Sequence, residues 1–279
     1  MSRNIFNTML LFYMFFSSCN KDSFGELSEK QLYLVGSGEP LKEEVKFEKF
    51  INSKSISIYC SGMEMPDADI QVELLIDDAI IAVENNKLGE NDEPYTLLPE
   101  QHLTYEHLKA VIPKGEEYGL LNFEISPIGL DPYLTYAIPF KLINTSRYAI
   151  NMKMDKLLYH VVLTNQYSGD YRMVGTLDGN NVSAVKKFRA ASDKEVIIYV
   201  DIKPELKVNN DYRIMLRKNT DNSISLSSKT LLISDQTNCY YNEEDESFNL
   251  SYVYQDPSTK NDVVVVEKLV KEDLTEDTD

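Results

Sequence analysis

Short segments in which apolar and polar residues alternate recur along most of the chain, separated by glycine and proline. Such alternation places the apolar side chains on one face of an extended strand and the polar ones on the other. In 55–60, Ile56, Ile58 and Cys60 share one face. One helix is predicted, at 77–87. Because helices do not alternate with strands in either half of the chain, the sequence predicts an all-β protein.

The strands fall into two groups, on either side of a polar break at 144–153. About seven short strands within roughly 115 residues favour an N-terminal immunoglobulin-like β-sandwich. Roughly eight or nine strands with short links favour a second, β-barrel or calycin-like domain, in which Asp178-Gly179 predicts a tight hairpin. The first group is 31–35, 45–50, 55–60, 70–76, 109–112, 120–125 and 136–143; the second is 157–165, 170–177, 182–188, 196–202, 212–217, 224–227, 231–234, 248–254 and 263–269.

The first 19 residues have the pattern of a secretory signal peptide: Arg3, the apolar run 9–16 and then small residues. The run is too short to span a bilayer, which needs ~20 residues, and the alternative is a buried N-terminal helix. Ser17-Ser18-Cys19 resembles the lipobox of bacterial lipoproteins, which implies acylation of Cys19 and firm anchoring in a membrane. The predicted organisation is a signal peptide (1–18), a lipidated tether (19–30), an Ig-like domain (31–146), a calycin-like barrel domain (153–271) and an acidic tail (272–279).

Composition removes several classes of function. The formal charge is −17 and the Lys and Arg residues form no large group, so a nucleic-acid partner is not expected. The chain has three histidines, His102, His107 and His160, and none lies near a nucleophile-elbow motif or a cysteine pair. The acidic run 243–246 lacks the turn glycine of a dedicated calcium loop and is interpreted as an exposed hairpin tip. No catalytic residue, metal or cofactor is predicted.

Several short sequence motifs resemble those of a known pair of domains. In the first half they are Ala68–Val72, Tyr95–Glu100, Val111–Gly115 and Tyr136–Phe140; in the second they are Tyr167–Tyr171 with Gly175, Phe248–Tyr254 and Val266–Leu269. The first set resembles a domain of unknown function at the front of Bacteroidetes surface lipoproteins, which also precedes the catalytic barrel of some family-18 endoglycosidases of glycan-utilisation loci. The second resembles its calycin-like companion. The endoglycosidases' motif Asp-x-x-Asp-x-Asp-x-Glu does not occur, so the resemblance implies glycan capture without catalysis.

A sugar-binding surface needs an aromatic ring for the apolar sugar face and polar groups for the hydroxyls. The chain has 18 tyrosines and no tryptophan. Most tyrosines of 248–254 are expected to face the core. The predicted glycan-binding residues are Tyr167, Tyr171 and Tyr241, with Asn165 and Asn242 as polar partners.

The sequence therefore predicts a non-enzymatic lipoprotein, anchored in the outer membrane and facing the cell exterior, that captures oligo- or polysaccharides. It would pass them to the components of an outer-membrane glycan importer. Three alternatives stay open: an adhesin or docking partner that binds a protein through a strand edge, a barrel that binds a lipid or small ligand, and a glycan-cleaving enzyme.

Overall fold

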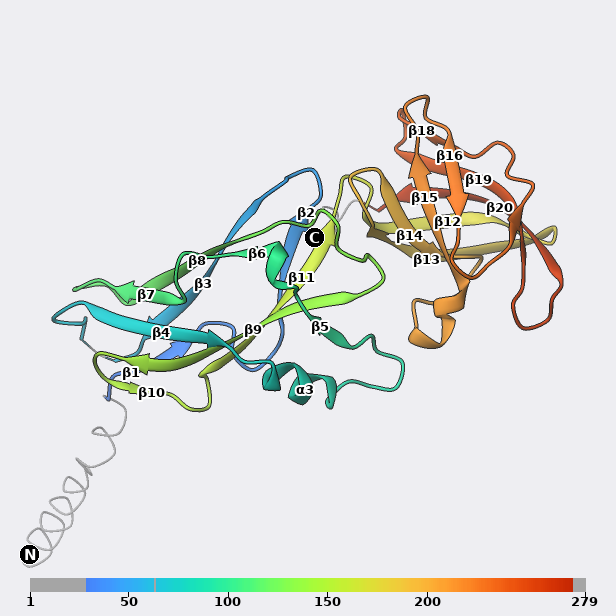
Figure 1. The fold of residues 1–279 in the computed structure, drawn as a ribbon. Coiled ribbons are helices and arrows are strands. Elements are labelled where there is room, and N and C mark those ends of the chain that lie inside the picture. Colours follow the sequence, from blue (N-terminus) through green and yellow to red (C-terminus); the bar gives the residue numbers. More distant parts are fainter. Residues whose placement is uncertain (1–28, 63, 273–279) are drawn as a thin grey trace, which may run out of the picture.

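The computed structural model describes residues 29–62 and 64–272, and the predicted signal peptide and Cys19 lie outside this part of the chain. The described chain is nearly all β, as predicted, and consists of an N-terminal unit of two packed sheets followed by a nearly closed barrel (Figure 1). Within the described residues, no helix has both the length and the apolar character needed to cross a membrane.

The N-terminal unit is an immunoglobulin-like sandwich. One sheet has the strand order β10-β1-β3-β8-β6, and the other has the order β2-β11-β9-β4-β7 with β5 beside β9. The first sheet consists of β1 (Gln31–Leu34), β3 (Asn52–Cys60), β6 (Leu103–Thr104), β8 (Tyr118–Ile125) and β10 (Ala149–Ile150). The second consists of β2 (Leu41–Lys46), β4 (Ile70–Ile76), β5 (Tyr95–Leu97), β7 (Lys109–Ile112), β9 (Thr135–Thr145) and β11 (Lys156–Thr164).

The core of this unit forms where the apolar faces of the two sheets meet. Ile56 and Ile58 on β3 are buried there, as the alternation of 55–60 predicts. Phe123, Phe140 and Tyr159 form an aromatic cluster between the sheets. The predicted helix is confirmed as α3 (Ala79–Asn85), which packs on the outer face of the second sheet. The 3₁₀ turn η1 (Glu100–His102) joins β5 to β6.

One strand lies in a different unit from the one that the sequence predicts. The run 157–165 was assigned to the second domain, but β11 pairs with β9 and, in parallel, with β2. In the structure the chain therefore passes from the first unit to the barrel after Thr164. The error has a physical cause, because alternation within 157–165 is the same in either unit and β2, the partner that β11 meets in parallel, lies more than a hundred residues earlier.

The C-terminal barrel has the strand order β16-β15-β14-β13-β12-β20-β19-β17, with β18 beside β19. Asp178 and Gly179 have φ values of 47° and 80°, and they turn the chain from β12 into β13 as predicted. The strands are β12 (Gly169–Leu177), β13 (Asn180–Ala190), β14 (Glu195–Tyr199), β15 (Arg213–Lys218), β16 (Ile224–Ser227), β17 (Ile233–Ser234), β18 (Tyr240–Asn242), β19 (Ser247–Gln255) and β20 (Asp262–Lys271), and the 3₁₀ turn η2 (Lys207–Tyr212) precedes β15.

A side-chain amide takes the place of a strand where the barrel closes. The Leu226 N–H donates to Oε1 of Gln236 (2.9 Å), and Nε2 of Gln236 donates to the Leu226 carbonyl (3.0 Å). Next to it, the Ile224 N–H donates to the Cys239 carbonyl (2.8 Å). The edge of β16 that faces away from β15 is thereby hydrogen-bonded along most of its length. It is therefore not available to pair with a strand of another chain.

The barrel interior holds an ion pair that the alternation pattern does not predict. Nζ of Lys186 on β13 lies 2.5 Å from Oε2 of Glu267 on β20, and the two side chains are 4% and 1% exposed. The Tyr252 hydroxyl donates to the other oxygen of Glu267 (3.3 Å). The inward orientation predicted for 248–254 is confirmed, since Phe248, Leu250, Tyr252 and Tyr254 are all buried.

Candidate functional site

A groove of about 710 Å³ lies on the N-terminal unit between β2 of one sheet and β3, β6 and β8 of the other. Its walls come from the first residues of β3 and the last residues of β8, which pair side by side. The groove is lined by Glu43, Ser53, Lys54, Ser55, Thr104, Tyr105, Glu106, Asn122, Phe123 and Glu124.

The groove combines an aromatic ring with many groups that form hydrogen bonds. Tyr105, directly after β6, is 40% exposed and has no aromatic neighbour among the described residues. The Ser55 and Asn122 side chains come from paired positions of β3 and β8, and so do those of Ser53 and Glu124. An exposed ring beside hydroxyl, amide and carboxylate groups is the arrangement that sugar recognition requires.

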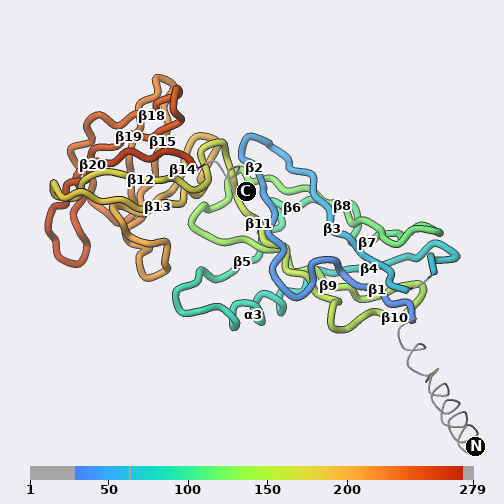
Figure 2. Tube along the Cα trace, turned by 180° about the vertical axis from the view of Figure 1, so that it is seen from behind, coloured from blue at the N-terminus to red at the C-terminus, as the bar shows by residue number. Residues whose placement is uncertain are grey.

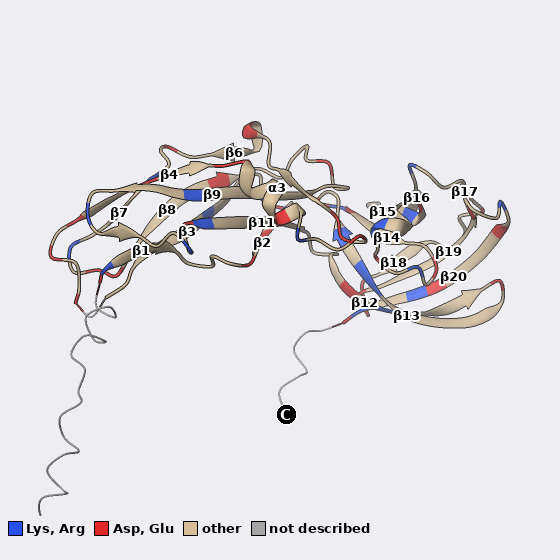
Figure 3. Cartoon of the chain, turned by 90° about the horizontal axis from the view of Figure 1, so that it is seen from below, with Lys and Arg blue, Asp and Glu red and all other residues tan. Residues whose placement is uncertain are grey.

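Ionised groups of both signs border the groove. Nζ of Lys54 lies 3.4 Å from Oε2 of Glu43, whereas Glu106 and Glu124 form no ion pair in the described structure. A second hollow of about 380 Å³ shares Glu43, Ser53 and Lys54 with the groove, and its own walls are formed mainly by lysines. Figure 3 shows the same mixture over the whole molecule, where acidic and basic residues are interspersed on both units.

Strand alternation alone does not reveal this groove. Tyr105 lies between His102 and His107 in the sequence, which gives no sign of a binding surface. In the structure, Nδ1 of His102 lies 2.9 Å from the Ser126 carbonyl oxygen. The available signal was the row of serines on the outward face of β3, Ser53, Ser55 and Ser57, but their position beside the polar end of β8 depends on the pairing of two strands far apart in sequence.

The predicted aromatic residues come together at one end of the barrel. The Tyr167 ring meets the Tyr241 ring edge-on with centroids 5.4 Å apart, and both rings contact Phe248. Tyr171 is 1% exposed and stacks on Phe188, with centroids 3.9 Å apart. Tyr241 is half-buried, and burial raises the pKa of its hydroxyl to about 12.

The hydrogen bonds of these predicted residues stabilise local turns. Asn165 is buried, and its Nδ2 donates to the carbonyl oxygens of Ser192 (2.6 Å) and Glu195 (2.9 Å). The Tyr171 hydroxyl donates to the Tyr167 carbonyl (2.9 Å). Oδ1 of Asn242 accepts from the Glu244 N–H (3.1 Å) at the tip of the acidic hairpin. Of the predicted rings, Tyr241 is the one that offers a partly accessible face.

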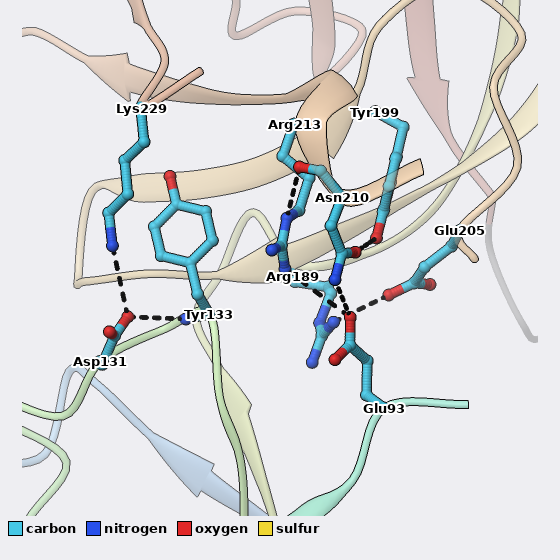
Figure 4. Close-up of polar contacts among 9 residues, drawn as sticks. All are labelled: Glu93, Asp131, Tyr133, Arg189, Tyr199, Glu205, Asn210, Arg213 and Lys229. Carbon is cyan, nitrogen blue, oxygen red and sulfur yellow. Dashed lines mark hydrogen bonds and ion pairs between the residues drawn. The ribbon is translucent and has the colours of Figure 1, made fainter. Parts of the chain in front are cut away.

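A polar junction joins the two units (Figure 4). The Tyr133 ring of the N-terminal unit contacts two barrel cations, with Nζ of Lys229 3.9 Å and Cζ of Arg213 4.8 Å from its centroid. Oε1 of Glu93 accepts from Nδ2 of Asn210 (2.6 Å), and it lies 3.9 Å from the Arg213 guanidinium. Contacts from two separate loops therefore orient the barrel relative to the sandwich.

The Tyr133–Lys229 contact can be measured by a double-mutant cycle. Tyr133→Ala and Lys229→Ala are expected to show a coupling of about 1 kcal/mol, because a cation over an aromatic ring contributes ~0.5–2 kcal/mol. Urea unfolding of the wild type, both single variants and the double variant measures it. A coupling within the error of the unfolding free energies would show that this contact does not stabilise the junction.

Two family models match consecutive parts of the chain. A model described as an N-terminal domain covers residues 28–149, and its companion, described as a C-terminal domain, covers residues 155–270. The chain belongs to this two-domain family. The resemblance to the Bacteroidetes module of unknown function and its companion domain is thereby confirmed. A search of the curated proteins found no match.

Solved structures of similar architecture come from Bacteroides. A protein of unknown function from Bacteroides ovatus has a TM-score of 0.64 and 17% identity, over 93% of this chain and 97% of that one. Another from the same species has a TM-score of 0.63 and 15% identity, over 88% and 93%. An auxiliary nutrient binding protein from Bacteroides thetaiotaomicron has a TM-score of 0.59 and 14% identity, over 82% and 89%. At these identities the likeness establishes the shared two-domain fold.

Proposed function

We propose that this protein captures glycans at the surface of the outer membrane without cleaving them. The observation that carries the proposal is the groove on the N-terminal unit, in which the exposed Tyr105 ring lies among hydroxyl, amide and carboxylate side chains. The auxiliary nutrient binding protein shares the fold, which supports a role in nutrient acquisition.

The chemistry of the described histidines supports binding rather than catalysis. His102 is engaged with a backbone carbonyl, and burial among cationic neighbours lowers the pKa of His160 to about 4. None of the three histidines, His102, His107 and His160, lines the groove. The groove residues can accept and donate hydrogen bonds to sugar hydroxyls, and they include no base held by an acid in the manner of a catalytic triad.

The N-terminal sequence supports a proposal for the location. We propose that Cys19 is acylated after removal of residues 1–18 and that the anchor places both units outside the cell. Captured chains would pass from there to the components of a glycan importer. The barrel-end residues Tyr167, Tyr171 and Tyr241, with Asn165 and Asn242, remain a second proposed contact region, in which Tyr241 provides the accessible ring.

Replacing the proposed platform tests the function. Tyr105→Ala in the mature protein without its anchor (residues 20–279) is expected to weaken binding about tenfold, because loss of an aromatic contact costs ~0.5–1.5 kcal/mol beyond the lost area. A glycan array identifies ligands, and affinity electrophoresis measures the change. Tyr118→Ala is the matched control, since Tyr118 is an exposed tyrosine of β8 outside the groove. Absence of binding by the wild type across a broad panel of host and plant glycans would contradict the proposal.

A further inference from the structure

The strand β2 lies at the edge of the second sheet and pairs with β11 alone among the described strands. Directly after β2, the Phe47 N–H donates to the Thr164 carbonyl (2.9 Å), which fixes the side of the strand that β11 occupies. Successive N–H groups of a strand point in opposite directions within the sheet, so the N–H and carbonyl groups of Lys42 and Glu44 point away from β11. No described strand pairs with them on that side.

This open edge ends at a side-chain amide, and the second hollow lies beside it. Oδ1 of Asn52 accepts from the Lys46 N–H (2.9 Å), and Nδ2 of Asn52 donates to the Lys46 carbonyl (3.0 Å). The hollow, of about 380 Å³, follows β2 from Lys42 to Lys46 and has Asn52 and Ser53 of β3 in its other wall. Space for a further chain segment is therefore left beside the unpaired backbone groups of Lys42 and Glu44.

The outward side chains of β2 carry alternating charges. Lys42, Glu44 and Lys46 share the exposed face of the strand, and none of them forms an ion pair in the described structure. Opposite charges at paired positions of neighbouring strands stabilise the pairing, and like charges oppose it. A strand that fits β2 therefore carries two acids four positions apart, with a basic or neutral residue midway between them.

From the open edge and its charges, we propose that β2 is a docking edge for an extended, acidic segment of a partner protein. The segment adds a strand beside β2, with its backbone bonded to Lys42 and Glu44 and its acids beside the lysines of the exposed face. In this mode of recognition main-chain hydrogen bonds supply the affinity, and side chains select the partner. The hollow shares Glu43, Ser53 and Lys54 with the groove, so the docked partner lies next to the proposed glycan-binding surface.

The barrel shows how this protein closes a strand edge. On β16, a side-chain amide and a neighbouring segment occupy the backbone groups that face away from β15. On β2, the Asn52 amide occupies those of Lys46 and leaves the two residues before it open. Charged side chains can also keep an edge from pairing, but a guarded edge accepts no strand, whereas a docking edge accepts the strand with complementary charges.

Two peptides of reversed charge test the docking edge on the mature protein without its anchor (residues 20–279). The peptide Thr-Glu-Thr-Lys-Thr-Glu-Thr matches the charges of β2 in either strand direction, and Thr-Lys-Thr-Glu-Thr-Lys-Thr opposes them. The first peptide is expected to bind about fivefold more tightly at low salt and to shift the amide resonances of Lys42 and Glu44 in NMR spectra. Equal binding of the two peptides, binding of neither, or shifts confined to another surface would overturn the proposal.

Proline separates the backbone contact from the charge. Glu44→Pro removes an N–H that no described strand uses, and an edge strand tolerates proline at such a position. Glu44→Thr is the matched control, because it removes the same carboxylate and keeps the N–H. The first peptide is expected to bind about tenfold more weakly to Glu44→Pro than to Glu44→Thr, while both variants keep the wild-type circular dichroism spectrum. Equal affinities would show that no strand is added at β2, and glycan binding by the wild type would be unaffected by that result.

Discussion

Lys186→Met is expected to lower the free energy of unfolding of the barrel by about 3–5 kcal/mol, because it leaves the Glu267 carboxylate buried without its cation. The Tyr252 hydroxyl remains as a donor to Glu267, but a neutral hydroxyl does not replace a charge partner in a site shielded from water. Urea unfolding followed by tyrosine fluorescence measures the change, and the slope of the transition reports whether both units still unfold together.

The double variant Lys186→Met/Glu267→Leu completes this test. Replacing both charges with apolar side chains is expected to recover most of the lost stability, because the attraction within a buried pair roughly offsets the cost of removing both ions from water. A double variant as unstable as the single one would contradict this account. It would show that the polar network itself is needed to hold β13 and β20 in the barrel.

Acidification is expected to destabilise the protein through His160. Its pKa is about 4 in the fold, lowered mainly by burial and further by Lys42, Arg189 and Lys187, against 6.5 in an unfolded chain. Between these values the unfolded chain binds a proton that the folded protein excludes, so stability falls as the pH falls. The expected loss from pH 7.5 to pH 4.5 is about 2–3 kcal/mol from this residue.

His160→Phe is designed to remove this dependence while keeping a ring beside Tyr95, which meets the His160 ring edge-on with centroids 5.2 Å apart. The difference in unfolding free energy between pH 7.5 and pH 4.5 is expected to be about 2–3 kcal/mol smaller in the variant. Asp256, whose pKa is lowered to about 2 mainly by the Ser258 hydroxyl, acts below pH 4 and does not enter this window. Parallel pH profiles for the two proteins would disprove the assignment.

Local patterns predicted the strands well because alternation of side chains is set by the backbone of each strand alone. The β12–β13 turn and the inward face of β19 were predicted for this reason. The assignment of β11 failed because its membership depends on pairing with β2. Alternation within 157–165 reads the same whichever sheet receives the strand.

The same limit applies to the candidate sites. The sequence predicted Tyr167, Tyr171 and Tyr241 as candidate residues, and these residues lie together in the structure. The alternation within a strand does not show which of the rings keeps an exposed face. The groove around Tyr105 was missed because it needs the register of β3 against β8 and the approach of β2.

The position of β1 bears on how large a glycan the groove can meet. β1 pairs with the last residues of β3 and the groove is built on the first ones, roughly 16 Å away along the strand at ~3.3 Å per residue. Figures 1 and 2 both place β1 and β10 at the end of the sandwich farthest from the barrel. With the proposed anchor entering at β1, the groove would lie on the part of β3 that is away from the anchor. A long polymer could then lie across it without colliding with the bilayer.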